Sequence, residues 1–246
     1  LLFLQKKVKR IEYSKNNKKW FTTKLLKFND LHNIIQVGDN VSVGLSGGVD
    51  SVTLLFLLEY LKRFSHLKFN LTAIHVNVYE KCDTKILKDY CDELEIEFFD
   101  IGIKKTDLPV PHKGICYTCS KLRKGAMIEY LKEKKINKLA LGHHSDDLAE
   151  TLLMNMDYHR TVDSLKPVSF LDRNDFTLLR PMLCMSKREI EVIHNAFQLP
   201  ILDYYCGYEE KNMREKYRNL LDEMSSTLPN LKANISEAFL KMVKEA

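Results

Sequence analysis

The sequence predicts an α/β protein with a doubly wound, mostly parallel sheet and helical extensions at both ends. Short apolar runs alternate along the chain with segments of helical periodicity, and glycine turns follow several of the runs. Strands that alternate with helices form βαβ units, in which neighbouring strands run parallel. The chain has 246 residues, of which 45% are hydrophobic and 29% charged. That balance can bury a core and excludes the disordered class.

The individual elements follow from the periodicity of the apolar residues. Strands are expected at Val41–Leu45, Leu71–Val78, Ile96–Ile101, Lys138–Leu141 and Phe176–Leu179. Helices are expected at Val49–Phe64, Thr84–Leu94, Cys119–Lys135, Asp146–Tyr158 and Ser186–Phe197. Two further amphipathic helices are expected within residues 209–246, broken at Pro229, and irregular structure at Gly102–Ile115 and 159–175.

The N-terminal segment is strongly basic. Residues 1–24 hold eight Lys and Arg residues against one acid, Glu12, in a chain whose formal net charge is +5. We expect a basic helical arm over residues 1–36, and such an arm on a near-neutral body suggests a polyanionic partner. The alternative is a solvated terminus without a partner.

Cysteine content and hydropathy indicate the cellular compartment in which the protein is expected. No apolar run approaches the roughly 18–20 residues of a membrane span, and Leu1–Leu4 is too short for the core of a secretory signal. A core-bearing chain of this kind with six cysteines fits the reducing cytoplasm better than a disulfide framework. Buried structural thiols are expected for the three cysteines outside any motif, which are Cys82, Cys91 and Cys184.

A strand, a glycine turn and a helix follow one another over residues 41–51. Gly47 and Gly48 allow the backbone to approach an anion, and the next helix adds the positive end of its dipole. Ser46 and Ser51 can add hydroxyl donors, and Asp50 could hold Mg²⁺ or orient the loop. The segment lacks the Walker A pattern. We interpret it as a phosphate loop, with a plain tight turn as the alternative.

A second polar motif runs from Leu141 to Thr151, at the junction of a strand and a helix. Gly142 allows close backbone approach, and Asp146 or Asp147 could simply cap the helix. Two aspartates, two histidines and Glu150 exceed what capping needs, so the motif could instead hold Mg²⁺ or position a nucleotide.

Cys116 and Cys119 form a C-x-x-C pair at the start of a helix, where the dipole and nearby Arg123 stabilise thiolates. The pair alone fits a zinc half-site, a redox dithiol, an iron–sulfur half-site or two incidental cysteines. A zinc site usually has a second pair. Cys206 would make three ligands, which leaves one iron of a cubane cluster open.

These motifs together resemble a known family. Ser46-Gly-Gly-x-Asp-Ser51 resembles the PP-loop of ATP pyrophosphatases, which cleave ATP between the α and β phosphates and adenylate a carbonyl oxygen. The stretch Gly142–Thr151, the cysteine motif with Arg123, Leu179–Met182 and Cys206-Gly207 resemble the tRNA 2-thiocytidine synthetases over roughly residues 20–230. That family usually has a second cysteine before the one matched here by Cys206.

The resemblance implies a fold of the adenine nucleotide alpha-hydrolase type and three segments. These are the arm over 1–36, a PP-loop ATP-binding catalytic domain with iron–sulfur cysteines over 37–207, and a helical tail over 208–246. ATP with Mg²⁺ would be bound by Leu45, Ser46, Gly47, Gly48, Asp50, Ser51, His75, Gly142 and Asp147. A [4Fe-4S] cluster would be held by Cys116, Cys119 and Cys206, and catalysis carried by Asp50, Asp147, Cys116, Cys206 and Arg123.

The implied activity is a tRNA sulfurtransferase that adenylates the C2 oxygen of a pyrimidine, with cytidine favoured, and replaces it with sulfur. The expected partners are tRNA and a sulfur donor, either a cysteine desulfurase or inorganic sulfide, with a homodimer as one assembly. The alternatives are a 2-thiouridine synthetase and a ligase similar to lysidine synthetase. No cysteine precedes Cys82, which argues against the 2-thiouridine branch with its N-terminal zinc-binding cysteines.

Overall fold

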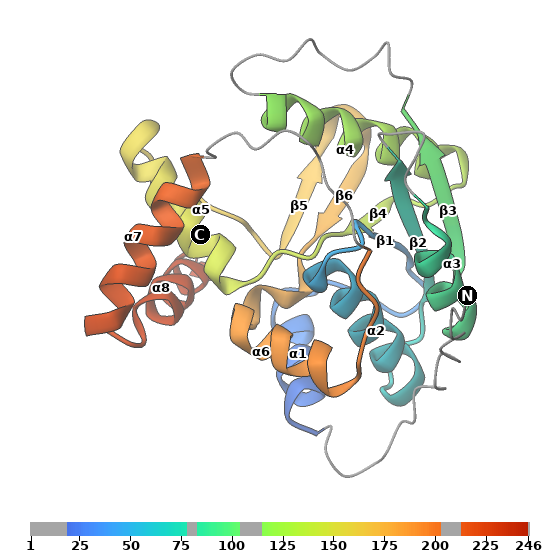
Figure 1. The fold of residues 1–246 in the computed structure, drawn as a ribbon, viewed down its shortest axis with the longest axis horizontal. Helices are drawn as coiled ribbons and strands as arrows, with labels where there is room; N and C mark the ends of the chain where they lie inside the picture. The colour runs from blue at the N-terminus through green and yellow to red at the C-terminus, as the bar shows by residue number, and fades with distance from the viewer. Residues whose placement is uncertain (1–18, 78–82, 104–114, 203–212, 246) are drawn as a thin grey trace, which may run out of the picture.

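A six-stranded sheet in the order β3-β2-β1-β4-β6-β5 forms the centre of the computed structural model, which describes residues 19–77, 83–103, 115–202 and 213–245 (Figure 1). The strands are β1 Asn40–Gly44, β2 Asn70–Asn77, β3 Glu97–Gly102, β4 Lys138–Ala140, β5 Val168–Leu171 and β6 Phe176–Leu179. All neighbouring strands pair in parallel except β5, which runs antiparallel to β6. The strand order reverses between β1 and β4, where open α/β sheets bind ligands beyond the strand ends.

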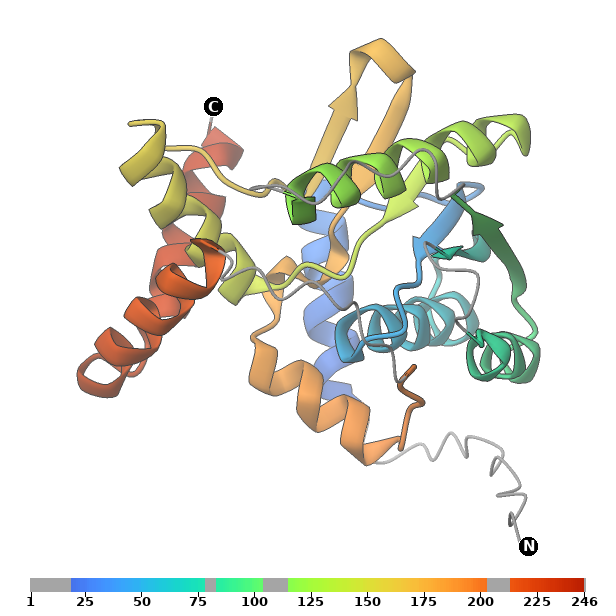
Figure 2. The ribbon, with the colours of Figure 1, turned by 45° about the horizontal axis from the view of Figure 1, so that its top comes forward.

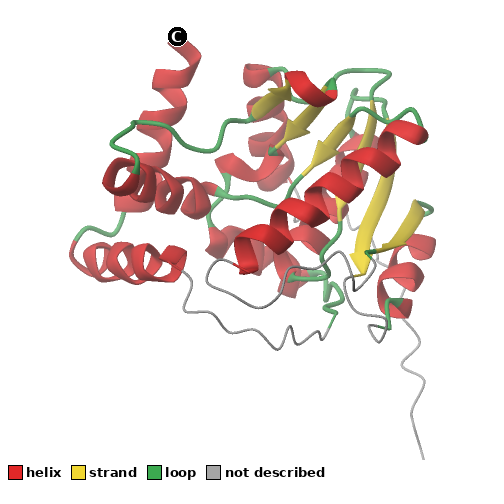
Figure 3. Cartoon of the chain, turned by 90° about the horizontal axis from the view of Figure 1, so that it is seen from above, coloured by secondary structure: helices red, strands yellow, loops and turns green. Residues whose placement is uncertain are grey.

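Helices cover both faces of this sheet, as the doubly wound prediction requires. They are α1 Lys19–His32, α2 Val49–Phe64, α3 Lys85–Glu93, α4 Ile115–Glu133, α5 Ser145–Tyr158, α6 Lys187–Ala196, α7 Met213–Thr227 and α8 Leu231–Glu245. One core joins the sheet to α1, α2, α3 and α6, and a second, smaller core packs α4 on the opposite face (Figure 2). The pair α7–α8 stands with α5 at one side of the sheet (Figures 1 and 3).

The hydrophobicity of each element explains its place. Helix α2 is apolar on nearly every face, and ten of its sixteen residues are buried, so it can lie only between the sheet and other helices. Strand β1 buries Val41, Ser42 and Val43 because parallel strands are covered on both faces. Helix α6 begins with the predicted capping box, in which Ser186 and Glu189 bond reciprocally to each other's backbone N–H.

The segment 159–175, expected to be irregular, contains a strand, and that prediction was wrong for Val168–Leu171. These residues form β5, which returns antiparallel to β6 through a short 3₁₀ turn at Asp172–Asn174 (Figure 2). An edge strand is covered on fewer sides, and none of its residues is fully buried. It therefore lacks the continuous apolar run that marked the inner strands.

Helix α4 begins at Ile115, four residues before the expected start at Cys119. The loop expected at Gly102–Ile115 lies mostly outside the described residues. The earlier start places both members of the C-x-x-C pair inside the first two turns of the helix. Three residues apart on an α-helix, they share one face.

Both expected extensions contribute to the fold in their described parts. Helix α1 inserts Phe21, Leu25 and Phe28 into the main core, and α8 contributes Phe239. Residues 1–18, half of the predicted arm, lie outside the described residues, so the arm boundary at residue 36 stays a prediction. Among the described helices, none combines the length and the hydropathy that crossing a bilayer demands.

We predict that Phe21→Ala lowers the free energy of unfolding by about 3–5 kcal/mol, because it deletes an aromatic ring that is 2% exposed. Leu31→Ala on the same helix removes a side chain that is 51% exposed and should cost less than about 0.5 kcal/mol. Urea denaturation followed by circular dichroism measures both. Equal losses for the two variants would contradict the packing of α1 into the core.

Candidate active site

The expected phosphate loop joins the end of β1 to the start of α2. The N-cap of α2 is Gly48, and no side chain bonds to the first N–H groups of the helix from that position. The dipole end of a sixteen-residue buried helix is therefore presented to the carboxyl edge of the sheet. This is the geometry with which a backbone binds an anion.

The hydroxyl of Ser51 holds the loop in shape. It accepts hydrogen bonds from the backbone N–H of Ser46 at 3.1 Å and of Gly47 at 3.2 Å, and it donates to the carbonyl of Gly48 at 3.0 Å. The Ser46 hydroxyl lies 3.0 Å from the Ser51 hydroxyl oxygen. Both serines were expected to donate to a phosphate. Here Ser51 is buried, and its hydroxyl bonds within the loop.

Gly47 has a conformation and a neighbour that require glycine. Its φ is +88°, and a Cβ atom would lie 2.4 Å from the Cβ of Leu202. The backbone N–H of Leu202 donates to the Gly47 carbonyl at 2.9 Å. The chain that leaves α6 thus lies directly on the phosphate loop.

The second motif follows β4 and touches the first through the backbone. A Cβ atom on Gly142 would lie 3.1 Å from the carbonyl carbon of Asp50 and from the amide nitrogen of Ser51. A side chain at residue 142 would press on this peptide, and the starts of α5 and α2 would have to separate by a few tenths of an ångström. The close backbone approach that was predicted at Gly142 is therefore made by the phosphate loop.

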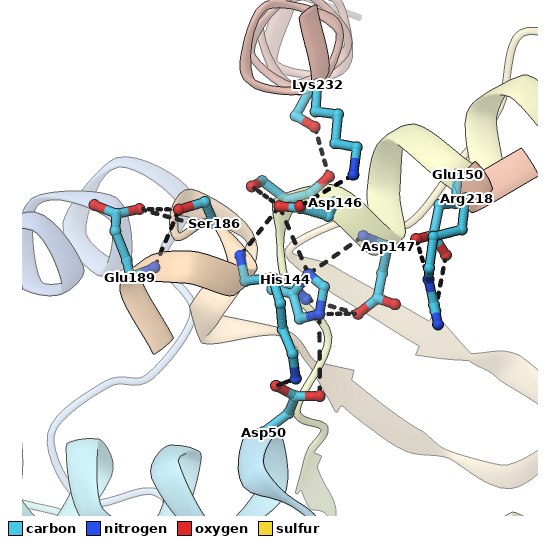
Figure 4. A network of polar contacts seen from close by, with 12 residues as sticks. Asp50, His144, Asp146, Asp147, Glu150, Ser186, Glu189, Arg218 and Lys232 are labelled. Atoms are coloured by element: carbon cyan, nitrogen blue, oxygen red, sulfur yellow. Dashed lines mark hydrogen bonds and ion pairs between the residues drawn. The ribbon is translucent and has the colours of Figure 1, made fainter. Parts of the chain in front are cut away.

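The N-cap of α5 is His144, so neither Asp146 nor Asp147 is the N-cap that the alternative expected, but Asp147 completes a capping box from position N3. The Asp147 N–H donates to His144 Nδ1 at 3.4 Å, and the His144 N–H donates to the Asp147 carboxylate at 3.1 Å. His144 Nε2 lies 3.4 Å from Asp147 Oδ2 and 4.0 Å from Asp50 Oδ2. The imidazole therefore stands between the two aspartates expected to bind Mg²⁺ (Figure 4).

Two lysines from other elements surround these carboxylates. Lys187 Nζ lies 2.6 Å from Asp50 Oδ1, and the Lys187 backbone N–H donates to Asp146 at 3.1 Å. Lys232 of α8 lies 3.7 Å from Asp146. Among the described residues no group of three His, Cys, Asp or Glu side chains is arranged to hold a metal ion. A cation bound at Asp50 or Asp147 would take its remaining oxygens from phosphates and water, as Mg²⁺ commonly does.

His75 borders the site at the end of β2. It is 3% exposed, and its Nδ1 lies 2.7 Å from the carbonyl of Leu45, which can only accept, so Nδ1 carries the proton. Burial lowers the pKa of His75, and the nearby Arg123 guanidinium lowers it further, against the Leu45 carbonyl and Asp100. The neutral ring leaves Nε2 as an acceptor. Helix α4, which carries Arg123, packs against β2.

The six cysteines divide between the described and undescribed residues. Cys116 and Cys119 lie on the first two turns of α4. Cys119 is partly buried and precedes Arg123 by one turn. Cys82 and Cys206 lie outside the described residues. Burial raises the pKa of Cys91 and of Cys184 to about 12, so both remain protonated thiols, as expected for structural cysteines.

The C-terminal helices hold the second motif from outside. Glu150 is 2% exposed and accepts from Arg218 Nε at 2.8 Å, and Arg214 donates to the Thr151 hydroxyl at 3.2 Å. The Ser236 hydroxyl donates to the Ser145 carbonyl at 2.7 Å. Sequence reasoning missed these contacts, and it missed Lys187, because no local pattern connects residues so far apart along the chain. The Ser186–Glu189 capping box was the one signal near Lys187.

Comparisons with known proteins agree with this geometry. A family model described as a PP-loop domain matches residues 18–221. A tRNA-cytidine(32) 2-sulfurtransferase of Coxiella burnetii is 32% identical over 217 residues, covering 85% of this chain and 84% of the relative. One from Legionella pneumophila is 34% identical over 213 residues, covering 84% of this chain and 75% of the relative.

A solved structure, U34-tRNA thiolase NcsA from Methanococcus maripaludis with its [4Fe-4S] cluster, shares the fold. The two structures superpose with a TM-score of 0.73 at 22% sequence identity, and the superposition covers 92% of this chain and 79% of that chain. The predicted α/β fold is therefore confirmed by a known structure as well as by the sheet order.

We predict that Gly47→Ala lowers the free energy of unfolding by about 3 kcal/mol, because it combines a strained φ with a clash against Leu202. Gly48→Ala is the matched control. A Cβ there meets only the Ser46 hydroxyl at 3.8 Å, so the cost to folding should stay below about 1 kcal/mol. Gly48→Ala should instead weaken ATP binding, measured by calorimetry. Equal unfolding curves for the two variants would contradict the role of Leu202.

His143 gives the fold a pH dependence. Burial lowers its pKa to about 4, with smaller contributions from Arg180, Arg214 and His144 against Asp147, and its buried Nδ1 has no hydrogen-bond partner among the described residues. In the unfolded chain the His143 imidazole is protonated near pH 6.5, whereas in the folded protein it stays neutral down to about pH 4. The free energy of unfolding should therefore fall as the pH drops through this window.

We predict that His143→Gln flattens this decline by up to about 3 kcal/mol between pH 6.5 and 4. Urea titrations at several pH values measure the slope. His66→Gln, which removes an exposed imidazole, is the control. Parallel curves for wild type and His143→Gln would show that the ring is as easily protonated in the folded protein as in the unfolded chain.

Proposed function

The chain belongs to the PP-loop family of the tRNA-cytidine 2-sulfurtransferases, and we propose that it is an ATP-dependent tRNA thiolase. The observation that carries this proposal is the backbone contact between the phosphate loop and the second motif, at Gly142 and Asp50–Ser51. It joins an open helix N-terminus to two aspartates at the switch point of the sheet. The relatives, which are named as tRNA-cytidine(32) 2-sulfurtransferases, indicate the substrate, a cytidine of tRNA.

In this proposal ATP lies along the carboxyl edge of the sheet. Within the loop from Leu45 to Ser51, the N–H groups at the start of α2 and the α2 dipole would bind the β and γ phosphates, because the N–H groups of Leu45, Ser46 and Gly47 are bonded within the protein. His75 would border adenine and accept from its amino group through Nε2. Asp50 and Asp147 would bind Mg²⁺ together with phosphate oxygens, and Gly142 would border the nucleotide through its backbone while its missing side chain admits the phosphate loop.

The first chemical step makes a leaving group. The C2 oxygen of the pyrimidine attacks the α phosphorus, a bond from that oxygen to phosphorus forms, and the bond to the β-phosphate oxygen breaks. Pyrophosphate departs into the loop. Arg123, whose charge reaches the end of β2, would stabilise the negative charge at the α phosphate.

The second step exchanges oxygen for sulfur. A sulfide-level nucleophile adds to C2, and the bond from C2 to the oxygen breaks as AMP leaves. No oxidant or reductant is needed at this stage. We propose that the sulfur comes from inorganic sulfide, or from a cysteine desulfurase whose persulfide sulfur is first released as sulfide by a thiol reductant, with oxidation of two thiols to a disulfide. A reducing cytoplasm, where thiols persist, suits this chemistry. Dimerisation stays a prediction.

The cysteines suit a [4Fe-4S] cluster by the chemistry of the donor set. Cys116 and Cys119 lie three residues apart at the start of α4, the helix that also carries Arg123. Cys206 lies outside the described residues, and its role as the third ligand is carried over from the resemblance of Cys206-Gly207 to the family motif. With these three thiolates as ligands, a cluster would keep one iron open to hold the sulfur. In that case Cys116 and Cys206 contribute to catalysis as ligands.

The test uses the full chain purified anaerobically, with tRNA, ATP, Mg²⁺ and sulfide. Pyrophosphate release reports adenylation, and mass spectrometry of digested tRNA reports 2-thiocytidine. We predict that Asp147→Asn lowers pyrophosphate release by about 10²–10³-fold while the visible absorbance of the cluster is retained. Cys119→Ala should lose that absorbance and the thiolated product, and Cys184→Ala is the matched control.

The outcomes separate the alternatives. The appearance of 2-thiouridine in place of 2-thiocytidine would change the assigned base. An amine adduct made without any sulfur source would indicate a ligase. Stoichiometric zinc with no iron in the purified protein would contradict the cluster, and the absence of tRNA-dependent pyrophosphate release would contradict the proposed reaction itself.

A further inference from the structure

The phosphate loop contains no cation of its own. Residues 45–51 include one acid, Asp50, and neither lysine nor arginine. Phosphate loops of the Walker type carry a lysine that reaches the phosphates. In this protein a distant part of the chain places a cation at the loop. Lys187, which is 137 residues from Asp50 in the sequence, has its Nζ 2.6 Å from Asp50 Oδ1.

The start of α6 is fixed so that this lysine faces the loop. The Lys187 N–H donates to Asp146, and the Ser145 N–H donates to the Met185 carbonyl at 2.8 Å. The capping box of Ser186 and Glu189 is itself held by Lys24, whose Nζ lies 2.6 Å from Glu189 (Figure 4 shows the box beside Asp146). The backbone of residue 187 is therefore anchored, while its long side chain extends to the open end of α2.

The ion pair is open to solvent. The side chains of Lys187 and Asp50 are 35% and 33% exposed, and ion pairs exposed to this extent are weak. A short movement of the flexible side chain exchanges the carboxylate for a phosphate oxygen beside it. A phosphate carries more charge than a carboxylate and accepts stronger charge-assisted hydrogen bonds.

We propose that Lys187 binds the β and γ phosphates of ATP, the part that leaves as pyrophosphate, and so supplies the cation that the loop lacks. The inference rests on the proposed function, since it assigns a further binding residue to the same site. It differs from a structural role, in which Lys187 would only fasten α6 to α2 through Asp50.

Binding experiments without tRNA or sulfur test the proposal. Calorimetry of the full chain measures ATP, inorganic pyrophosphate and AMP with wild type, Lys187→Ala, Lys187→Arg and the control Arg188→Ala. Arg188 is the next basic residue on the same turn and is exposed. Loss of one charge-assisted contact should weaken ATP and pyrophosphate by about 10–100-fold in Lys187→Ala. AMP should change by less than about twofold, since that contact is absent from it.

The remaining outcomes decide against the proposal. Equal weakening of AMP and ATP would show that Lys187 only positions the loop, and unchanged pyrophosphate binding would show that it does not reach the phosphates. In an Asp50→Asn background, where the ion pair is gone, Lys187→Ala should still weaken pyrophosphate, and no further loss there would favour the structural role. Because these assays need no thiolation, their result is independent of whether the proposed reaction succeeds.

Discussion

The close backbone contact between Gly142 and the Asp50–Ser51 peptide is the constraint on which the rest of the site depends. Two helices, α2 and α5, begin side by side because the strands before them, β1 and β4, are neighbours at the switch point of the sheet. A side chain at residue 142 would have to displace the start of α2 by a few tenths of an ångström. Every polar contact between the two motifs follows from that approach.

This contact concentrates charge in a small volume, and the surrounding elements balance it. Asp50, Asp146 and Asp147 lie within reach of one imidazole, His144. Lys187 from α6 and Lys232 from α8 bring positive charge to the same point. Carboxylates gathered without such partners would repel one another and any phosphate, so the approach of α6 and α8 is an electrostatic requirement of the site.

The C-terminal helices therefore belong to the functional architecture. The buried Glu150 on α5 is compensated by Arg218 on α7, and an unpaired carboxylate at that depth would be strongly destabilising. Ser236 fixes the first carbonyl of α5. The region predicted as a helical tail thus sets the position of the helix that carries the second motif, and the family match, which extends to residue 221, includes part of it.

The sequence by itself determined the inner strands, most helices and the chemistry of both motifs, because apolar periodicity, glycine turns and capping residues act over a few neighbouring positions. It missed β5, since a half-covered edge strand has no continuous apolar run. The residue types left open the local choice of His144 over the aspartates as the N-cap of α5, and the tertiary structure alone decided that Leu202 lies on Gly47 and that Lys187 faces Asp50. These contacts join residues brought together by strand order, and the energy that fixes them comes from burial and charge balance between elements, which no local pattern encodes.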